Sequence, residues 1–262
     1  MKRFPKYVLV SKLPKDYQFI DLSDYGRPVA RVIAHSLKNT SFTPVHVTLG
    51  FIVSGLIAIF CIVNGYYGAA AFFLVFKSIL DAADGELARL KKTPSYTGRY
   101  LDSVSDVILN MLILSSLWYI TDSNITLTVL AFLGLQLQGT LYNYYYVILR
   151  NAHGGDKTSR IFEDSTPTAL KGEKQKTVNI LFRLYKICYG YFDKTIYMMD
   201  KTAADSSHFP NWLMTAVSTF GLGFQLLIIS VMLVLGLKDF IIPFFIGYSS
   251  MILVFIVIRK QL

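Results

Sequence analysis

Six long stretches of hydrophobic residues run through the chain and are separated by polar or charged segments. Each has about the length, roughly 20 residues, that a helix needs to cross a bilayer core of about 30 Å. A backbone inside a bilayer must satisfy its own hydrogen bonds, so such stretches are helical. We therefore predict an all-α integral membrane protein. Its six transmembrane helices are expected at residues 45–63, 65–87, 99–120, 125–149, 211–236 and 239–258.

Two other segments have the apolar and basic stripes that are typical of helices lying on a membrane surface. In residues 24–39 the basic stripe holds Arg27, Arg31, His35 and Lys38, and the apolar stripe holds Val29, Ile33 and Leu37. We predict an N-terminal amphipathic helix here, with a solvated basic linker as the alternative. In residues 174–200 the apolar positions are Val178, Leu181, Tyr185, Cys188, Phe192 and Ile196. This segment is expected to form a second amphipathic helix, on the cytoplasmic surface or packed against the preceding loop.

These elements predict one membrane domain. Residues 1–44 are expected to form a cytoplasmic arm and the first surface helix, and residues 45–262 the six-helix membrane domain. Residues 151–209 are expected to form a cytoplasmic loop that carries the second amphipathic helix.

The charge of the chain supports this arrangement and predicts its orientation. With 53% hydrophobic and 16% charged residues, the chain is too apolar for an ordinary soluble domain. Lys and Arg gather before residue 45, between the second and third stretches, in residues 150–210 and at the end, whereas the alternate turns carry only Lys238. The positive-inside rule therefore places both termini and the basic loops in the cytoplasm. Because the charge follows membrane sidedness, we expect no nucleic-acid partner.

Four aspartates stand toward the ends of two neighbouring hydrophobic stretches. Asp81 and Asp84 lie three residues apart in the second stretch, and Asp102 and Asp106 lie four apart in the third. These spacings put each pair on one helix face. The short connection makes the two helices antiparallel, so both acidic faces meet just inside the cytoplasmic boundary. Carboxylates near hydrocarbon are costly and seldom persist without a function.

The chemistry of these acids predicts a divalent metal site. Converging carboxylates without Cys or His favour Mg²⁺ or Mn²⁺, and two ions about 4 Å apart would explain four of them. Such a pair would polarise a phosphoanhydride, with Asp106 as the candidate to receive a proton from an attacking hydroxyl. Gly85, Ala88 and Gly98 leave room for a substrate, and Arg89 offers a fork-shaped phosphate contact.

Ordinary ion pairs are the alternative explanation for these acids. They would join Asp81 to Lys77, Glu86 to Lys91 or Lys92, and Asp102 to Arg99. The carboxylates outnumber the partners that this explanation supplies, so we favour a metal site. Lys77 lies one turn before Asp81 on the same face, and we expect a counter-ion to Asp81 or Asp106, with a contact to an acceptor as the alternative.

Two other groups have a structural and a functional interpretation. The first group is a cluster of four tyrosines: Tyr142, Tyr144, Tyr145 and Tyr146. They either line a cavity or serve helix packing and interface anchoring, and we favour packing and anchoring. The second group is basic and contains Arg150, Lys157 and Arg160. These residues either bind an acceptor phosphate or mark the cytoplasmic side, and we favour their being markers of the cytoplasmic side.

The pattern D-x2-D-G-x2-A-R-x8-G-x3-D-x3-D resembles the signature of the CDP-alcohol phosphotransferase (CDP-alcohol phosphatidyltransferase) family. Its fixed positions are filled by Asp81, Asp84, Gly85, Ala88, Arg89, Gly98, Asp102 and Asp106. Relatives often carry Pro-Asn-x-x-Thr before the first span, and here Pro44 and Thr48 remain while the Asn is missing. We expect His46 in this segment to be an interfacial residue rather than a ligand.

The resemblance implies a membrane enzyme that moves a substituted phosphate from a CDP-alcohol donor to an acceptor hydroxyl and releases CMP. It implies that the four aspartates hold two Mg²⁺ or Mn²⁺ ions and that Asp106 is the base. It also implies that Gly85, Ala88, Arg89 and Gly98 surround the CDP group, and that the protein is a homodimer among membrane lipids.

The substrates stay open at this level. A CDP-diacylglycerol donor with a polar acceptor, such as an inositol phosphate, glycerol phosphate or serine, would indicate phospholipid biosynthesis. A small CDP-alcohol of the choline, ethanolamine or inositol type, with a lipid or polyol acceptor, is the alternative. The compact six-span plan is more similar to prokaryotic members, so we expect a bacterial or archaeal inner membrane. A divalent cation transporter is the other class, but its carboxylates would lie near the bilayer midplane.

Overall fold

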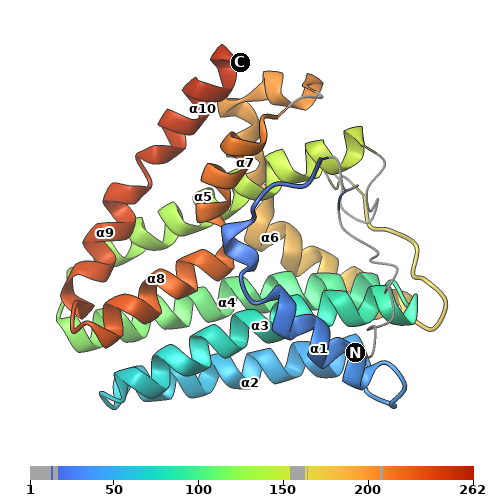
Figure 1. Cartoon of the computed structure of the whole chain (residues 1–262), viewed down its shortest axis with the longest axis horizontal. Coiled ribbons are helices and arrows are strands. Elements are labelled where there is room, and N and C mark those ends of the chain that lie inside the picture. Colours follow the sequence, from blue (N-terminus) through green and yellow to red (C-terminus); the bar gives the residue numbers. More distant parts are fainter. Residues whose placement is uncertain (1–12, 14–16, 154–162, 164, 207–208) are drawn as a thin grey trace, which may run out of the picture.

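The computed structural model describes residues 13, 17–153, 163, 165–206 and 209–262, and every regular element in these ranges is a helix (Figure 1). The first elements are η2 (Leu22–Asp24), α1 (Arg27–Leu37), α2 (Pro44–Val63), α3 (Tyr67–Lys91), α4 (Tyr96–Thr121) and α5 (Ile125–Ala152). The others are α6 (Gln175–Met199), η3 (Lys201–Asp205), α7 (Asn211–Val217), η4 (Ser218–Phe220), α8 (Leu222–Val234), η5 (Lys238–Phe240), α9 (Ile241–Tyr248) and α10 (Met251–Gln261). Most of the predicted N-terminal arm, together with Lys157 and Arg160, lies outside the described residues.

Helices α2, α3 and α4 run side by side and form the layer that carries the four aspartates (Figure 1). Helix α2 packs against both α3 and α4, so it holds the two acid-bearing helices together. Helices α1 and α8 cover α3, while α6 and α5 pack against α4. The acids therefore lie within a group of packed helices rather than on a loop.

Four described segments are long and apolar enough to cross a membrane: Pro44–Val63, Tyr96–Thr121, Ile125–Ala152 and Lys238–Gln261. Two further helical segments are separated by a short break and bent by 56° relative to each other: Asn211–Phe220 and Leu222–Val234. They form a fifth span if they are counted together. Helix α3 matches the second predicted stretch and has 25 residues, but it is not among these segments. The reason is its charge, because Lys77, Asp81, Asp84 and Glu86 interrupt its apolar sequence. Of the six predicted spans, four are thus confirmed, or five if the bent pair counts as one span.

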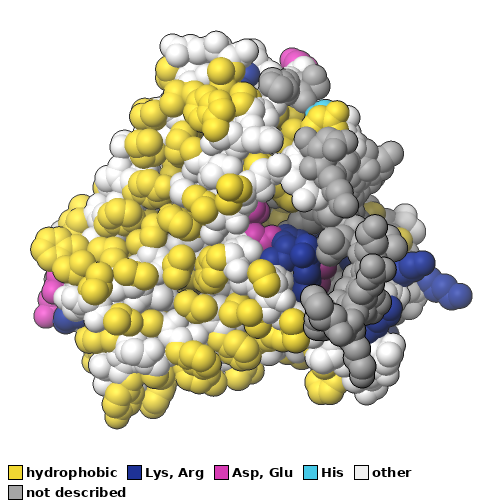
Figure 2. All heavy atoms as spheres, in the orientation of Figure 1, with side chains coloured by type: hydrophobic (Ala, Val, Ile, Leu, Met, Phe, Trp, Pro, Cys, Tyr) yellow, Lys and Arg dark blue, Asp and Glu magenta, His cyan; other side chains and the backbone are white. Residues whose placement is uncertain are grey.

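The surface of the molecule separates apolar from charged side chains. Figure 2 shows hydrophobic side chains over most of the face formed by α2, α8 and α9, whereas charged side chains form one group near the centre of the view and otherwise lie at the edges of the molecule. A broad apolar surface of this kind is what a protein surrounded by lipid presents.

The turn between α3 and α4 is fixed by local and long-range hydrogen bonds. Lys92 ends α3 in a left-handed conformation with φ 54°, and Ser95 begins α4 by accepting the Gly98 N–H at 2.8 Å. Glu173, from the loop before α6, accepts the Ser95 hydroxyl at 2.8 Å and the Thr97 N–H at 2.7 Å. The connection between the two acidic faces is therefore tied to a segment far away in the sequence.

The fifth hydrophobic stretch is broken because another segment fits against its break. A Cβ on Gly223 would lie 2.0 Å from the carbonyl oxygen of Ser23, and a Cβ on Gly221 would lie 2.3 Å from the Ser23 Cβ. The glycines thus let η2 approach the start of α8 at backbone distance. The Ser218 hydroxyl accepts the Leu22 N–H at 2.9 Å and holds this contact.

Helix α1 forms where the N-terminal amphipathic helix was predicted, and two of the three residues of the predicted apolar stripe, Ile33 and Leu37, pack against α3. The contact also buries Ala30 and Ala34 against Ala83 and Leu87 of α3, whereas Val29 of the predicted stripe is 51% exposed. The small alanine side chains let the two helices approach closely. The solvated-linker alternative is wrong, and the position of α1 on a membrane surface stays a prediction.

Helix α6 forms where the second amphipathic helix was predicted, and the predicted apolar face is its inner face. Val178 and Tyr185 are buried and join a hydrophobic cluster with Tyr100 and Val104 of α4. The helix therefore packs on the acid-bearing layer rather than on the preceding loop alone.

Candidate metal centre

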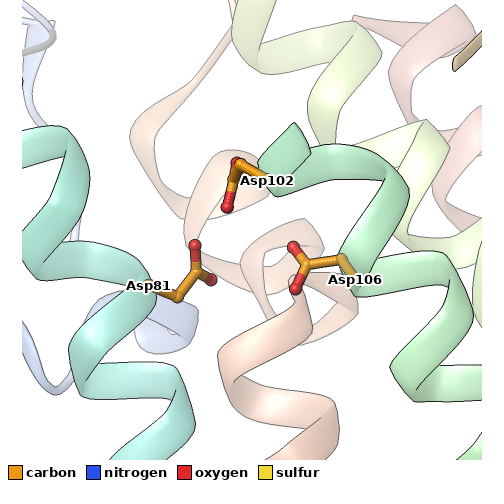
Figure 3. A group of neighbouring side chains, drawn as sticks. All are labelled: Asp81, Asp102 and Asp106. Atoms are coloured by element: carbon orange, nitrogen blue, oxygen red, sulfur yellow. The ribbon is translucent and has the colours of Figure 1, made fainter. Parts of the chain in front are cut away.

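Three of the four predicted aspartates meet in the structure. Asp81 comes from α3, and Asp102 and Asp106 come from successive turns of α4 (Figure 3). One carboxylate oxygen from each of them lies within 4.8 Å of the others. A group of carboxylate oxygens at this spacing can converge on a divalent cation.

Asp84 lies one turn beyond Asp81 and is held by α2. Its Oδ2 accepts the Thr48 hydroxyl at 2.7 Å, and both side chains are buried. Asp84 is therefore outside the group of three, although it lies on the same face of α3. Thr48 belongs to the segment in which the Asn of related sequences is missing, and the structure shows that its hydroxyl still reaches an acid of the motif.

Lys77 is a buried counter-ion of the acid group. Its side chain is 0% exposed, and its ammonium donates a hydrogen bond to the Asp106 carboxylate. The same Nζ lies 4.9 Å from the centre of the Phe51 ring of α2, a cation–π arrangement. The prediction of a counter-ion is confirmed, and Asp106 is its partner.

The other ion pairs that could have explained the acids are different in the structure. Glu86 pairs with Arg27 at 2.7 Å and with Arg89 at 3.2 Å, rather than with Lys91 or Lys92. Arg99, the expected partner of Asp102, pairs with Glu163.

Asp102 is consequently left with an unpaired oxygen. Within the described residues, its buried Oδ1 has no hydrogen-bond partner. A buried carboxylate oxygen without a donor is costly, and a cation would satisfy it. Among the described residues, four carboxylates lie near one another with one buried lysine, a set of oxygen donors that fits Mg²⁺ or Mn²⁺.

The remaining motif residues form a partly open face next to the acids. Gly85, Ala88 and Arg89 on α3 and Gly98 on α4 are half-buried. A Cβ on Gly85 would lie 3.5 Å from the Arg89 guanidinium, so Arg89 folds back over Gly85. Open small residues beside a cationic fork can admit a phosphate-bearing group.

His46 has a structural role in this structure. Its Nδ1 accepts the Thr43 N–H at 3.0 Å and caps the start of α2. The expectation that it is not a ligand of the acid group agrees with this contact.

The tyrosines of α5 serve packing, as we favoured. Tyr145 donates to Asp200 at 2.6 Å, and Arg259 of α10 donates to the same carboxylate at 2.8 Å. Tyr142 donates to Asp21 at 2.5 Å. Arg150 is buried under Tyr146, with its guanidinium 5.7 Å from the ring centre, so it does not extend freely from the end of α5.

Sequence reasoning missed the contribution of α6 to the acid group. Tyr189 donates a hydrogen bond at 3.2 Å to the carbonyl oxygen of Ser103, which lies between Asp102 and Asp106 in the sequence. Tyr185 stacks on Tyr189 with ring centres 5.1 Å apart. The four-residue spacing of these tyrosines indicates a shared helix face, but no local signal indicates which helix that face contacts.

The fold and the site together define a helical membrane protein with a carboxylate-rich centre at one end of its apolar helices. Comparison with known families specifies it further: the chain belongs to the CDP-alcohol phosphatidyltransferase family, which it matches over residues 42–255. A comparison with the curated proteins gave no match.

Membership of this family establishes the general chemistry. These proteins are transferases that move a phosphate-linked alcohol from a CDP-alcohol to an acceptor, and they typically use a divalent metal. The matched range contains all four aspartates and runs from α2 into α10. With its apolar helices, the chain is an integral membrane transferase.

Proposed function

We propose that this protein transfers a substituted phosphate from CDP-diacylglycerol to a polar acceptor, such as an inositol phosphate or glycerol phosphate, and releases CMP in phospholipid biosynthesis. The observation that carries the proposal is the acid group itself: oxygens of Asp81, Asp102 and Asp106 within 4.8 Å, in a chain that matches the transferase family. A small CDP-alcohol donor with a lipid or polyol acceptor is the alternative within the same reaction.

Asp81, Asp84, Asp102 and Asp106 would together hold two Mg²⁺ or Mn²⁺ ions. When bound, the ions would supply positive charge to the donor diphosphate and to the charge that develops during transfer. To bind an ion, Asp84 would either turn away from Thr48 toward the other acids or keep its hydrogen bond with Thr48 and bind from its present position. The unpaired Asp102 oxygen supports this assignment because it lacks a donor from the described residues.

The residues of the chain would then position the donor and move one proton. Gly85, Ala88 and Gly98 would admit the CDP group, and Arg89 would contact its phosphates. Asp106 would accept the proton of the acceptor hydroxyl while the new oxygen–phosphorus bond forms and the bond to CMP breaks. Lys77 would hold Asp106 in place until the substrates arrive.

We further propose that α3 is the sixth transmembrane helix and that both termini and the acid group lie toward the cytoplasm. The distribution of Lys and Arg supports this orientation. Residues 1–44 would form an arm and surface helix, and residues 45–262 the catalytic domain, with 151–209 as a cytoplasmic segment. A homodimer in a bacterial or archaeal inner membrane completes the proposal.

The test is a product assay with purified protein in lipid. CMP release and new products are measured by mass spectrometry for a panel of CDP-alcohols and acceptors, with Mg²⁺, with Mn²⁺ and after chelation. We expect CMP release only with a donor, an acceptor and a divalent ion. Full CMP production after exhaustive chelation would contradict the metal assignment, and product only from small CDP-alcohols would select the alternative donor.

A further inference from the structure

Helix α6 has a second apolar face, which has no part in the acid group. Its inner face packs on α4, but a stripe on the other side is exposed: Ile180, Leu184, Ile187, Tyr191 and Met198. Ile187 and Tyr191 are each 77% exposed, which is high for large apolar side chains on one helix. The spacings of three, four and seven residues place all five on one side along most of the helix.

A row of basic residues runs beside this stripe. Lys176, Arg183 and Lys194 are exposed and are separated by seven and eleven residues, which correspond to two and three turns at about 3.6 residues per turn. Asp193 is the acid within the helix sequence, and it is half-buried on another side. The exposed face of α6 thus combines an apolar stripe with positive charge and no exposed acid.

The contacts of the inner face determine how α6 is oriented. Its first half packs near Tyr100, at the beginning of α4, and Ile196 near its end joins the cluster that contains Tyr144 and Ile148 of α5. Tyr100 lies four residues into α4, and Ile148 lies four residues from the end of α5. Helix α6 therefore packs against the same end of two helices that are able to span a membrane.

We propose that the outer face of α6 binds the surface of an anionic bilayer. The apolar stripe inserts at the boundary of headgroups and acyl chains, and the row of Lys176, Arg183 and Lys194 binds lipid phosphates. An in-plane helix with basic residues beside an apolar stripe is suited to this environment, and each basic residue near an anionic surface adds attraction.

Charge argues against a second copy of the chain on this face. Two copies related by an axis along the membrane normal would bring their α6 helices together antiparallel. Arg183 of one copy would then lie beside the basic row of the other, and like charges at close range oppose pairing. Anionic lipid has the complementary charge.

The contact would place the acid group next to the lipid surface. The inner face of the same helix donates the Tyr189 hydrogen bond to Ser103, between Asp102 and Asp106. A helix that binds lipid on one side and the α4 backbone on the other links the membrane surface to the acids.

The experiment measures where the outer face lies in the full-length protein. Cys61→Ala and Cys188→Ser remove the native thiols, and a single cysteine at Ile187 or, in a second variant, at Tyr191 carries an environment-sensitive fluorophore. The protein is reconstituted into phosphatidylcholine vesicles with and without phosphatidylglycerol. Quenching is measured with nitroxide-labelled lipid and with iodide. A label at Lys186, which is exposed on another side of the helix, is the matched control.

We expect nitroxide lipid to quench the labels at 187 and 191 strongly and iodide to quench them weakly, with the reverse at 186. Arg183→Glu with Lys194→Glu should reduce lipid quenching at 187 in the anionic vesicles, whereas Lys171→Glu with Lys201→Glu, outside the helix, should not. Iodide quenching without lipid quenching at both positions would overturn the proposal. Energy transfer between labels of two copies, without lipid quenching, would instead assign the face to a second copy and also overturn it.

Discussion

At the scale of single residues, Lys77 determines the electrostatics of the acid group. Its ammonium is completely buried and pairs directly with Asp106, whereas Asp81 and Asp102 have no direct ion pair with a side chain of the described residues. A buried ion pair adds little net stability, but removal of one partner is costly because the other charge remains buried. Lys77 and Asp106 therefore lead to different predictions.

Lys77→Met should destabilise the metal-free protein by about 3–5 kcal/mol, because it leaves Asp106 unpaired in a buried site. Added Mn²⁺ should recover part of this loss by supplying positive charge to the same carboxylates. The measurement is thermal unfolding in detergent with and without Mn²⁺. In a Lys77→Met and Asp106→Asn double variant the loss should be smaller than the sum of the two single losses, and simple additivity would contradict direct pairing.

Asp106→Asn should lower turnover by roughly 10²–10⁴-fold, the usual contribution of a positioned general base. Donor binding should remain largely intact, because Asp81, Asp84 and Asp102 can still hold metal. CMP release and equilibrium binding of a CDP-alcohol check these two parts separately. Asp122→Asn, in the exposed turn after α4, is the matched control and should behave as the unaltered protein. Near-normal turnover of Asp106→Asn would exclude it as the base.

At the scale of elements, one contact holds an acid-bearing helix directly and another holds α8, which packs against α3. Glu173 ties the start of α4 to the loop before α6, and η2 closes against the start of α8. Neither contact is indicated by the periodicity of the helices involved, and each can be tested by one substitution with a control.

The contact of Glu173 predicts a pH dependence of stability. Burial raises the pKa of Glu173, but hydrogen bonds from the Thr97 and Leu170 N–H groups and the Ser95 hydroxyl outweigh it, so the pKa is lowered from 4.5. A lowered pKa in the folded state gives stability that is present above 4.5 and is lost as the pH falls through the folded value. Unfolding followed between neutral pH and pH values below 4.5 should show a steeper loss for the unaltered protein than for Glu173→Gln. Equal slopes would show that Glu173 is not held in this way.

Gly223→Ala should destabilise the protein by about 1–3 kcal/mol, the usual cost of overpacking, because its Cβ would meet the Ser23 carbonyl at 2.0 Å. Gly247→Ala in α9 is the control, since nothing lies within 4 Å of its added Cβ. That variant should be neutral or more stable by up to about 1 kcal/mol, because alanine favours a helix. The two free energies of unfolding are compared by denaturant titration, and equal values would contradict the close approach of η2.

At the scale of the whole molecule, the course of α3 through the membrane decides where the acids lie. Its 25 residues are long enough to cross, and the sequence predicts a span here, but its charges leave it out of the segments that are apolar enough in the structure. If α3 crosses, Tyr66 before it and Thr93 after it lie on opposite sides of the membrane.

In a variant without native cysteines, an impermeant maleimide should label Tyr66→Cys in intact cells and Thr93→Cys only after permeabilisation. Both positions are exposed, so access to solvent does not limit the reaction. Asp239→Cys, in the turn before α9, is expected on the same side as Tyr66 and serves as the reference. Labelling of positions 66 and 93 under the same condition would exclude α3 as a sixth span.

The sequence by itself determined the helical class, the approximate bounds of the long helices, and the two acidic faces. Helix periodicity and the length needed to cross a bilayer are local properties, so they can be read from consecutive residues. The tertiary structure alone decided that Lys77 pairs with Asp106, that Thr48 holds Asp84, that Glu86 turns to Arg27, and that α6 packs on α4 through Tyr189. Each of these contacts depends on which helix faces enclose the acids. Polar and charged groups that are removed from water bind the partners that packing brings within reach, and these partners can be far away along the chain.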